Sequence, residues 1–181
     1  NGTTMAELRT ACEAGAAVEG LLRKVDVKPG DVCFIPAGCV HAIGAGILLA
    51  EVQQNSDLTY RVSDWGRLGA DGKPRELHVQ RALEVSKTQP YTLPCGQAGE
   101  VNDIAGGKLR TLANCPYFAT YELTLQGAAH IPADIRCVLC TEGSATLTSE
   151  GCEDISLTAG ACVYIPEGLQ ATVFGEGKAL W

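Results

Sequence analysis

The sequence predicts an all-β protein with minor helix, and three features of its 181 residues support this fold class. Short apolar runs recur about every 8–12 residues, which is typical of strands in an antiparallel sandwich or barrel. The 21 glycines and 8 prolines place turn-forming residues between these runs. One pattern of turns around a short apolar run also occurs twice. Together these features favour two units of one β architecture.

The first part of the chain is expected to combine helix with several short strands. Residues 4–16 carry apolar side chains at helical spacing, with Thr4 as the cap and Gly15 near the end. Apolar runs between Gly- and Pro-containing turns then indicate strands. The expected strands are residues 21–27, residues 32–35, a segment containing His41, and residues 47–54 after a loop at 44–46; residues 58–63 are expected to be extended, and residues 75–87 to be a strand followed by a helix.

The last third of the chain is expected to be almost entirely β. Short apolar runs follow one another from Pro116 onward, separated by turns that contain Gly, Glu or Pro. The expected strands are residues 117–125, 135–141, 144–149, 153–157, 161–165 and 170–174.

The repeated pattern relates residues 28–38 to residues 158–168. Each copy contains a glycine, five residues, a proline, one residue and a second glycine. An internal repeat of this kind predicts two units with the same architecture. We place them at residues 1–90 and 91–181.

Charge and hydropathy exclude several classes of function. The net charge is −7 and the basic residues are not clustered, so a nucleic-acid surface is not expected. No apolar run approaches the roughly 18 residues of a membrane span, and no export signal is recognised. We therefore expect a cytoplasmic protein with neither a nucleic-acid partner nor a membrane partner.

The nine cysteines are expected to be reduced and mostly buried thiols. Cys137 and Cys140 have the C-x-x-C spacing of redox and zinc sites. Because they lie in a strand-like run, where residues three apart point to opposite faces, a joint site for this pair is disfavoured.

The first copy of the repeat continues to a histidine and reads Gly30, five residues, Pro36, one residue, Gly38, two residues, His41. This pattern resembles the second motif of the cupin superfamily, whose histidine is a metal ligand. The resemblance implies two cupin-type jelly-roll units, of which the first is incomplete. The second copy has Ala171 at the histidine position, so we expect no metal site there.

The stretch after His41 narrows the resemblance. Residues 47–61 include Glu-Val-Gln-Gln-Asn-Ser-Asp-Leu-Thr-Tyr-Arg, and residues 74–78 read Pro-Arg-Glu-Leu-His. Together with the repeat, they closely resemble the C-terminal part of bacterial type I phosphomannose isomerases. The resemblance implies a zinc-dependent enzyme that interconverts mannose 6-phosphate and fructose 6-phosphate. In such enzymes a proton moves between C1 and C2 of the hexose 6-phosphate.

The resemblance also implies roles for individual residues. His41 matches a zinc ligand, and Arg61 and Glu51 match a substrate-contacting arginine and a carboxylate near the metal. Weaker candidates for the substrate pocket are Gln53, Asn55 and Tyr60. The other zinc ligands of the family lie upstream of the matching region, so an upstream segment of the same protein is expected to complete the site. The two other histidines, His78 and His130, are expected to be structural or exposed.

Two other functions are compatible with the residues. The chain is alternatively a non-catalytic cupin fragment that binds a sugar or a sugar phosphate, which the missing ligands favour. A different metal cupin, such as an oxygenase, is the second alternative. It requires a cluster of two or three histidines, and only His41 is well placed for one.

Overall fold

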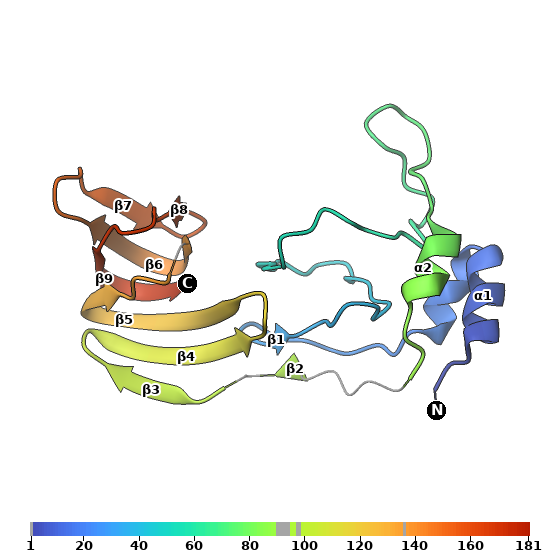
Figure 1. The fold of residues 1–181 in the computed structure, drawn as a ribbon, viewed down its shortest axis with the longest axis horizontal. Coiled ribbons are helices and arrows are strands. Elements are labelled where there is room, and N and C mark those ends of the chain that lie inside the picture. Colours follow the sequence, from blue (N-terminus) through green and yellow to red (C-terminus); the bar gives the residue numbers. More distant parts are fainter. Residues whose placement is uncertain (1, 90–94, 97–98, 136) are drawn as a thin grey trace. The chain divides into compact units, whose positions relative to one another are not determined.

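The computed structural model describes residues 2–89, 95–96, 99–135 and 137–181, and the chain divides into two compact units (Figure 1). The first unit is Asn1–Gly96 and the second is Gln97–Trp181. The boundary expected at residue 90 lies outside the described residues.

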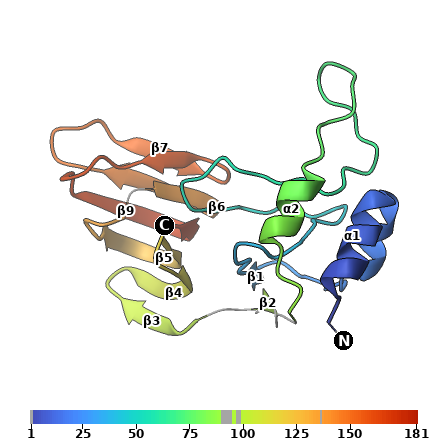
Figure 2. The same ribbon diagram turned by 45° about the vertical axis from the view of Figure 1, so that its right-hand side comes forward.

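The first unit is held by two helices. Helix α1, Met5–Glu13, begins with a capping box in which the Thr4 hydroxyl accepts the Glu7 N–H at 3.2 Å, while the Glu7 carboxylate accepts the Thr4 N–H at 2.7 Å. A 3₁₀ helix, Ala16–Leu21, follows it. Helix α2, Val79–Val85, lies beside α1, and Leu83 packs against Leu8 in a small apolar core (Figures 1 and 2). Both predicted helices are confirmed.

Several strands predicted for this unit are not formed. Strand β1, Val32–Cys33, pairs with β2, Cys95–Gly96, and the other described residues of the unit form no further strand. The predictions at 21–27, around His41, at 47–54 and at the start of 75–87 are therefore wrong. A strand exists only where a neighbouring strand accepts and donates its backbone hydrogen bonds in a ladder, and in the described residues none of these segments has such a partner. The predicted turns at 29–30, 37–38 and 45–46 are present.

The second unit is a seven-stranded antiparallel sheet. Its order is β3-β4-β5-β9-β6-β7, with β8 paired to β6. The longest strands, β5, β6 and β9, are neighbours in its centre (Figure 1). The bounds are β3 Val101–Ile104, β4 Gly107–Asn114, β5 Ala119–Ile131, β6 Cys137–Thr148, β7 Ile155–Thr158, β8 Cys162–Tyr164 and β9 Ala171–Leu180.

The core of this unit follows the alternation of side chains along its strands. Leu123, Val138, Leu157 and Val173 are its largest fully buried side chains, and they come from β5, β6, β7 and β9. The same alternation separates the C-x-x-C pair: Cys140 is buried, whereas Cys137 is exposed. Their predicted placement on opposite faces is confirmed.

Two details of the sheet differ from the sequence prediction. Strands β3 and β4 were not predicted, because their side chains are largely polar and their burial does not alternate regularly. Strand β6 was predicted as two strands, residues 135–141 and 144–149, but it is continuous. It passes through Gly143 with a change of register at Cys140 and Glu142. The glycine that suggested a break is instead accommodated inside the strand.

The predicted repeat is present in the backbone. In the first copy Asp31 N–H donates to Lys28 O at 3.1 Å, and Cys39 N–H donates to Pro36 O at 3.1 Å. In the second copy the equivalent bonds join Ala161 to Thr158 at 2.8 Å and Leu169 to Pro166 at 3.2 Å. The glycines that close the second turn have φ values of +84° at Gly38 and +82° at Gly168, a region that favours glycine. The two short strands between these turns are β1 and β8.

Replacing Gly143 by alanine is expected to destabilise the second unit strongly. An added Cβ would lie 2.4 Å from the Glu176 carbonyl oxygen, at a φ of +78°. Gly151 is the matched control, since its φ is +75° and nothing lies within 4 Å of its added Cβ. We expect Gly143→Ala to cost about 2 kcal/mol more than Gly151→Ala in the free energy of unfolding. Equal losses in urea unfolding would show that the close approach of β9 is unimportant.

Candidate functional site

His41 follows the second turn of the first repeat copy, and its ring is oriented by a local hydrogen bond. Nδ1 lies 2.9 Å from the Cys39 carbonyl oxygen, and the side chain is exposed. A carbonyl oxygen only accepts, so Nδ1 carries the proton and donates it. In the neutral ring Nε2 then holds the lone pair, as in metal-ligating histidines oriented by a backbone carbonyl. His41 is therefore suited to act as one metal ligand.

The described residues do not complete a metal site around it. Zinc prefers four ligands, of which at least three usually come from the protein. Among the residues that the structure describes, no group of three or more His, Cys, Asp or Glu side chains could hold a metal ion. Glu51 is exposed, and within this part of the chain no hydrogen bond or ion pair joins it to His41. The residues present thus fit one zinc ligand but not a whole zinc site.

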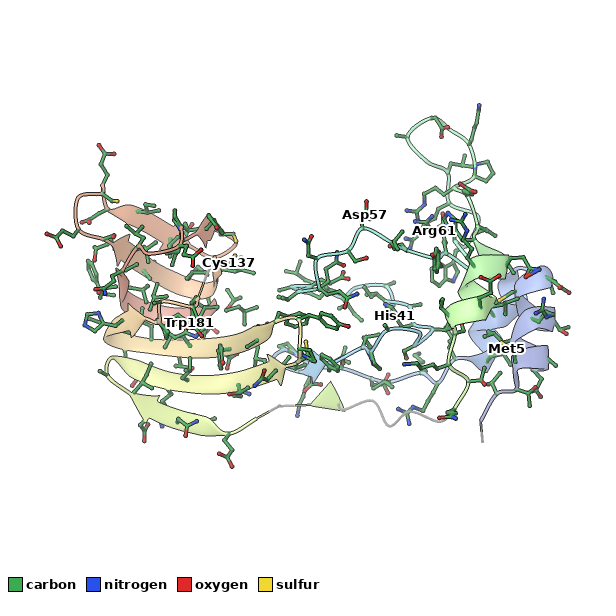
Figure 3. The ribbon with its side chains drawn as sticks, in the orientation of Figure 1. Met5, His41, Asp57, Arg61, Cys137 and Trp181 are labelled. Atoms are coloured by element: carbon green, nitrogen blue, oxygen red, sulfur yellow. The ribbon has the colours of Figure 1, made fainter. Side chains whose placement is uncertain are left out.

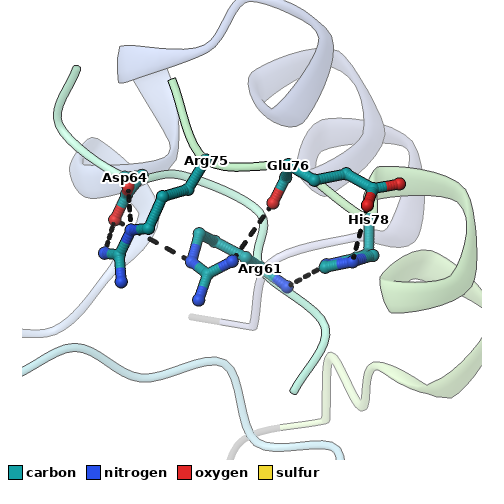
Figure 4. A network of polar contacts seen from close by, with 5 residues as sticks. All are labelled: Arg61, Asp64, Arg75, Glu76 and His78. Carbon is teal, nitrogen blue, oxygen red and sulfur yellow. Dashed lines mark hydrogen bonds and ion pairs between the residues drawn. The ribbon is translucent and has the colours of Figure 1, made fainter. Parts of the chain in front are cut away.

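Arg61 is anchored to the segment that precedes α2 (Figure 4). Its N–H donates to Nδ1 of His78 at 3.2 Å, and the His78 N–H donates to the Arg61 carbonyl oxygen at 2.7 Å. The guanidinium donates through one terminal nitrogen to the Glu76 carbonyl oxygen at 3.2 Å, and its Nε lies 3.8 Å from a carboxylate oxygen of Asp64. Backbone and side chain of Arg61 are thus both positioned by residues 64–78.

Asp64 links Arg61 to a second arginine. Arg75 donates to both oxygens of the Asp64 carboxylate, with 2.6 Å between Nε and Oδ2 (Figure 4). The hydrogen bonds from Arg75 are the main reason why the pKa of the buried Asp64 lies below its ordinary value of 3.8, and Arg61 and Arg67 lower it further. The same contact raises the pKa of Arg75. Asp64 is therefore a carboxylate at neutral pH and holds positive charge on both sides.

The weaker pocket candidates lie on the segment before Arg61. The Gln53 side-chain amide donates to the Ser56 carbonyl oxygen at 3.1 Å, which makes it part of a local turn, and Asn55 is exposed. The Tyr60 ring lies 6.2 Å from the His78 ring, centroid to centroid, with an interplanar angle of 53°. His78 therefore contacts two candidates, Tyr60 and Arg61, in a structural role.

The structure does not join His41 and Arg61 directly. They come from separate segments of the first unit (Figure 3), and in the described residues no hydrogen bond connects their side chains. An open hollow lies instead on the sheet of the second unit, lined by residues such as Gln126, Ser144 and Phe174. None of the predicted site residues lines that hollow.

Asp64 and Arg75 were not singled out by the sequence prediction. They are eleven residues apart, and their pairing depends on how the chain returns through the turn at residues 69–73. The only available signal was the presence of Arg75 in the stretch of residues 74–78 on which the family resemblance rests.

Comparison with known proteins identifies relatives but no family model that matches. The mannose-6-phosphate isomerase ManA of Bacillus subtilis is 44% identical over 131 residues, which are 72% of this chain and 41% of the relative. The chain is related to the mannose-6-phosphate isomerases. A second such isomerase, from Streptococcus mutans, is 31% identical over 172 residues, which are 93% of this chain and 52% of the relative.

A crystal structure of the Bacillus subtilis mannose 6-phosphate isomerase has the same fold. It matches with a TM-score of 0.83 at 30% identity, over 99% of this chain and 57% of that chain. The predicted all-β fold class with minor helix is thereby confirmed. The chain covers only 41% and 52% of the length of these two relatives. This agrees with the predicted resemblance to the C-terminal part of such an isomerase. In the described residues, no helix is both long and apolar enough to cross a membrane.

Replacing Asp64 by asparagine is expected to lower the stability of the first unit at pH 6. Because folding lowers the pKa of Asp64, its stabilising contribution is complete above the ordinary value of 3.8 and is lost as the pH falls through the lowered pKa. The difference in urea midpoint between wild type and Asp64→Asn should therefore become smaller below pH 3.8. Urea unfolding would be followed by Trp65 fluorescence in a Trp181→Phe background.

The exposed Asp57 provides the matched control, and Asp57→Asn should leave the urea midpoint unchanged. Identical midpoints for wild type and Asp64→Asn at pH 6 would contradict a stabilising role for the pair with Arg75.

Proposed function

We propose that this chain is the C-terminal part of a zinc-dependent isomerase that interconverts mannose 6-phosphate and fructose 6-phosphate. Support comes from its relatives, which are mannose-6-phosphate isomerases at 44% and 31% identity. The two sugars differ by the position of a carbonyl group, so a proton must move between C1 and C2. Such a reaction uses an acid–base group, stabilisation of the developing oxyanion and a cation for the phosphate.

The positioned guanidinium of Arg61 is the observation that carries this proposal at the level of the site. A guanidinium has five N–H donors, and one of them is taken by the Glu76 carbonyl oxygen. The remaining donors are available to grip two oxygens of a phosphate or of an anionic intermediate. Because the side chain is already held by Glu76 and Asp64, less conformational entropy is lost on binding.

The other candidates have supporting roles in this proposal. Glu51 is assigned to the neighbourhood of the metal as a carboxylate that handles protons or charge. Gln53, Asn55 and Tyr60 are assigned to contacts with the hydroxyl groups of the sugar. All four lie on the segment that leads to Arg61. They can therefore contact the same ligand when this segment folds around that ligand.

We propose that His41 supplies one zinc ligand and that an upstream segment of the same protein supplies the others. The tautomer of His41 supports the first part, since Nε2 is left to accept. The second part is supported by an unusual run of exposed apolar side chains at residues 43–58. Leu48 is fully exposed and Ile43 is half exposed, at 51%. Such a run is expected to be covered by another segment.

A non-catalytic fragment that binds a sugar or a sugar phosphate is the second candidate. The observation that favours it is the single ligand-like histidine among the described residues. Such a fragment would still use Arg61 for the phosphate but would not move a proton. Turnover and binding must therefore be measured separately.

Replacing Arg61 by alanine is expected to reduce isomerase activity by about 100-fold in kcat/KM, because a charge-stabilising donor is removed. The test joins this chain to the preceding part of the Bacillus subtilis isomerase and measures formation of fructose 6-phosphate from mannose 6-phosphate. The zinc content of each purified variant is measured as well, and His41→Ala should lower it.

Arg81→Ala is the matched control for this test, because Arg81 is an exposed arginine on α2. It should retain full activity. Unchanged activity in Arg61→Ala would remove Arg61 from the site. A folded chimera that binds fructose 6-phosphate without turning it over would favour the non-catalytic candidate.

Amide hydrogen exchange is expected to be much faster in the first unit than in the second when the 181-residue chain is studied alone. Most described backbone of the first unit has no strand partner, whereas the second unit is a seven-stranded sheet whose strands are all paired. In the chimera, protection at residues 41–61 should rise. Uniform protection across both units of the isolated chain would contradict the need for a covering segment.

A further inference from the structure

Two exposed cysteines of the second unit lie side by side. The sulfur atoms of Cys137 on β6 and Cys162 on β8 are 3.2 Å apart, and both side chains are exposed. Neither cysteine belongs to the candidate site in the first unit. The spacing is that of two thiols in contact, about 1 Å longer than a disulfide bond.

The strand register explains why these two cysteines meet. Cys137 pairs with Tyr164, and Leu139 pairs with Cys162. The two cysteines are therefore diagonal neighbours across an antiparallel ladder, with their side chains on one face. Cys140 points to the opposite face and is buried in the core. The partner of Cys137 is thus Cys162, from a different strand, and not the second cysteine of its C-x-x-C motif.

We propose that Cys137 and Cys162 are a redox-active dithiol that a low-molecular-weight disulfide, such as oxidised glutathione, converts into an intramolecular disulfide. The chemistry is thiol–disulfide exchange and does not depend on the proposed isomerase activity. The site requires an exposed first thiol, a second thiol within reach and an accessible path for the oxidant. The contact between the two sulfurs and their exposure meet all three requirements.

The reaction proceeds in two exchanges that balance. The Cys162 thiolate attacks one sulfur of oxidised glutathione, the S–S bond of glutathione breaks, and one glutathione thiolate leaves. The Cys137 sulfur then attacks the Cys162 sulfur, loses its proton to the solvent, and releases the second glutathione. Two protein thiols are oxidised to one disulfide, and one glutathione disulfide is reduced to two thiols.

The order of the two exchanges follows from the environment of Cys137. Partial desolvation of its sulfur, followed by the neighbouring Cys162 sulfur, raises the pKa of Cys137 to about 11. Cys137 is therefore a thiol at neutral pH, and the first attack belongs to Cys162. Once Cys162 is part of a mixed disulfide its sulfur is neutral, so no charge on that sulfur opposes ionisation of Cys137.

The disulfide would fix a short strand. In the described part of the chain β8 has only three residues and pairs only with β6. A covalent link between Cys137 and Cys162 closes the chain from β6 through β7 to β8. Oxidation should therefore protect this edge of the sheet against local opening.

The test treats the reduced full chain with oxidised glutathione and blocks remaining thiols with iodoacetamide. Before blocking, intact mass spectrometry should show a loss of 2 Da without bound glutathione. After blocking, the oxidised chain should carry two carbamidomethyl groups fewer than the reduced chain. Cleavage after Glu142 and Glu153 separates the peptide containing Cys137 and Cys140 from the peptide containing Cys162, and an alkylated Cys140 in the cross-linked product assigns the link to Cys137. The melting temperature of the second unit should rise by at least about 4 °C and fall again after reduction.

Three variants make the test decisive. Cys137→Ser and Cys162→Ser should each abolish the 2 Da loss and the thermal shift, and Cys137→Ser should retain glutathione on Cys162. Cys152→Ser is the matched control, because Cys152 is exposed, and it should form the disulfide as the wild type does. The proposal is overturned if Cys137 and Cys162 are both alkylated after oxidation, or if the cross-link joins either of them to another cysteine.

Discussion

The second unit depends on the pairing of β9 with strands on both of its sides. β9 lies between β5 and β6, so its backbone groups are satisfied along nearly its whole length. This arrangement brings together strands that are far apart in the chain and buries residues such as Leu123, Val138 and Val173. The close approach requires glycine at Gly143, Gly175 and Gly177, where a side chain would meet the backbone of the neighbouring strand. The cysteine pair results from a separate register, that of β6 with β8.

The first unit illustrates what happens where such pairing is missing. Its apolar residues at 43–58 have the composition of strands. In the described residues, however, this segment has no strand partner, and its large apolar side chains remain exposed. Order is concentrated instead around local interactions, which are the capped α1, the packing of α1 on α2, and the polar network of residues 61–78 (Figure 4). In that network the Asp64 carboxylate forms ion pairs with both Arg61 and Arg75, so the orientation of Arg61 depends on Arg75.

Local features of the fold could be predicted from the sequence, and non-local ones could not. The helix capped by Thr4 and the turns around Gly38 and Gly168 depend on residues a few positions apart, and all were predicted. The strand predicted at 47–54 was wrong because a strand depends on its partner. Strands β3 and β4 were missed because their side chains are largely polar and their burial does not alternate regularly. For the site, the family resemblance singled out His41 and Arg61. The pairing of Asp64 with Arg75 and the contact of His78 with Arg61 required the structure.

The small β1–β2 pair has a consequence for the order in which the chain folds. It joins Val32 to Gly96, so the chain between them, which is most of the first unit after α1, forms one large loop that is closed at its base by four residues. Closing a loop of this size is entropically costly and slow compared with forming a hairpin. On the ribosome, α1 can form as soon as it emerges, whereas the loop cannot be closed until β2 has been synthesised. Folding intermediates of this protein should therefore have an open first unit, in which α1 is formed before β1 and β2 pair.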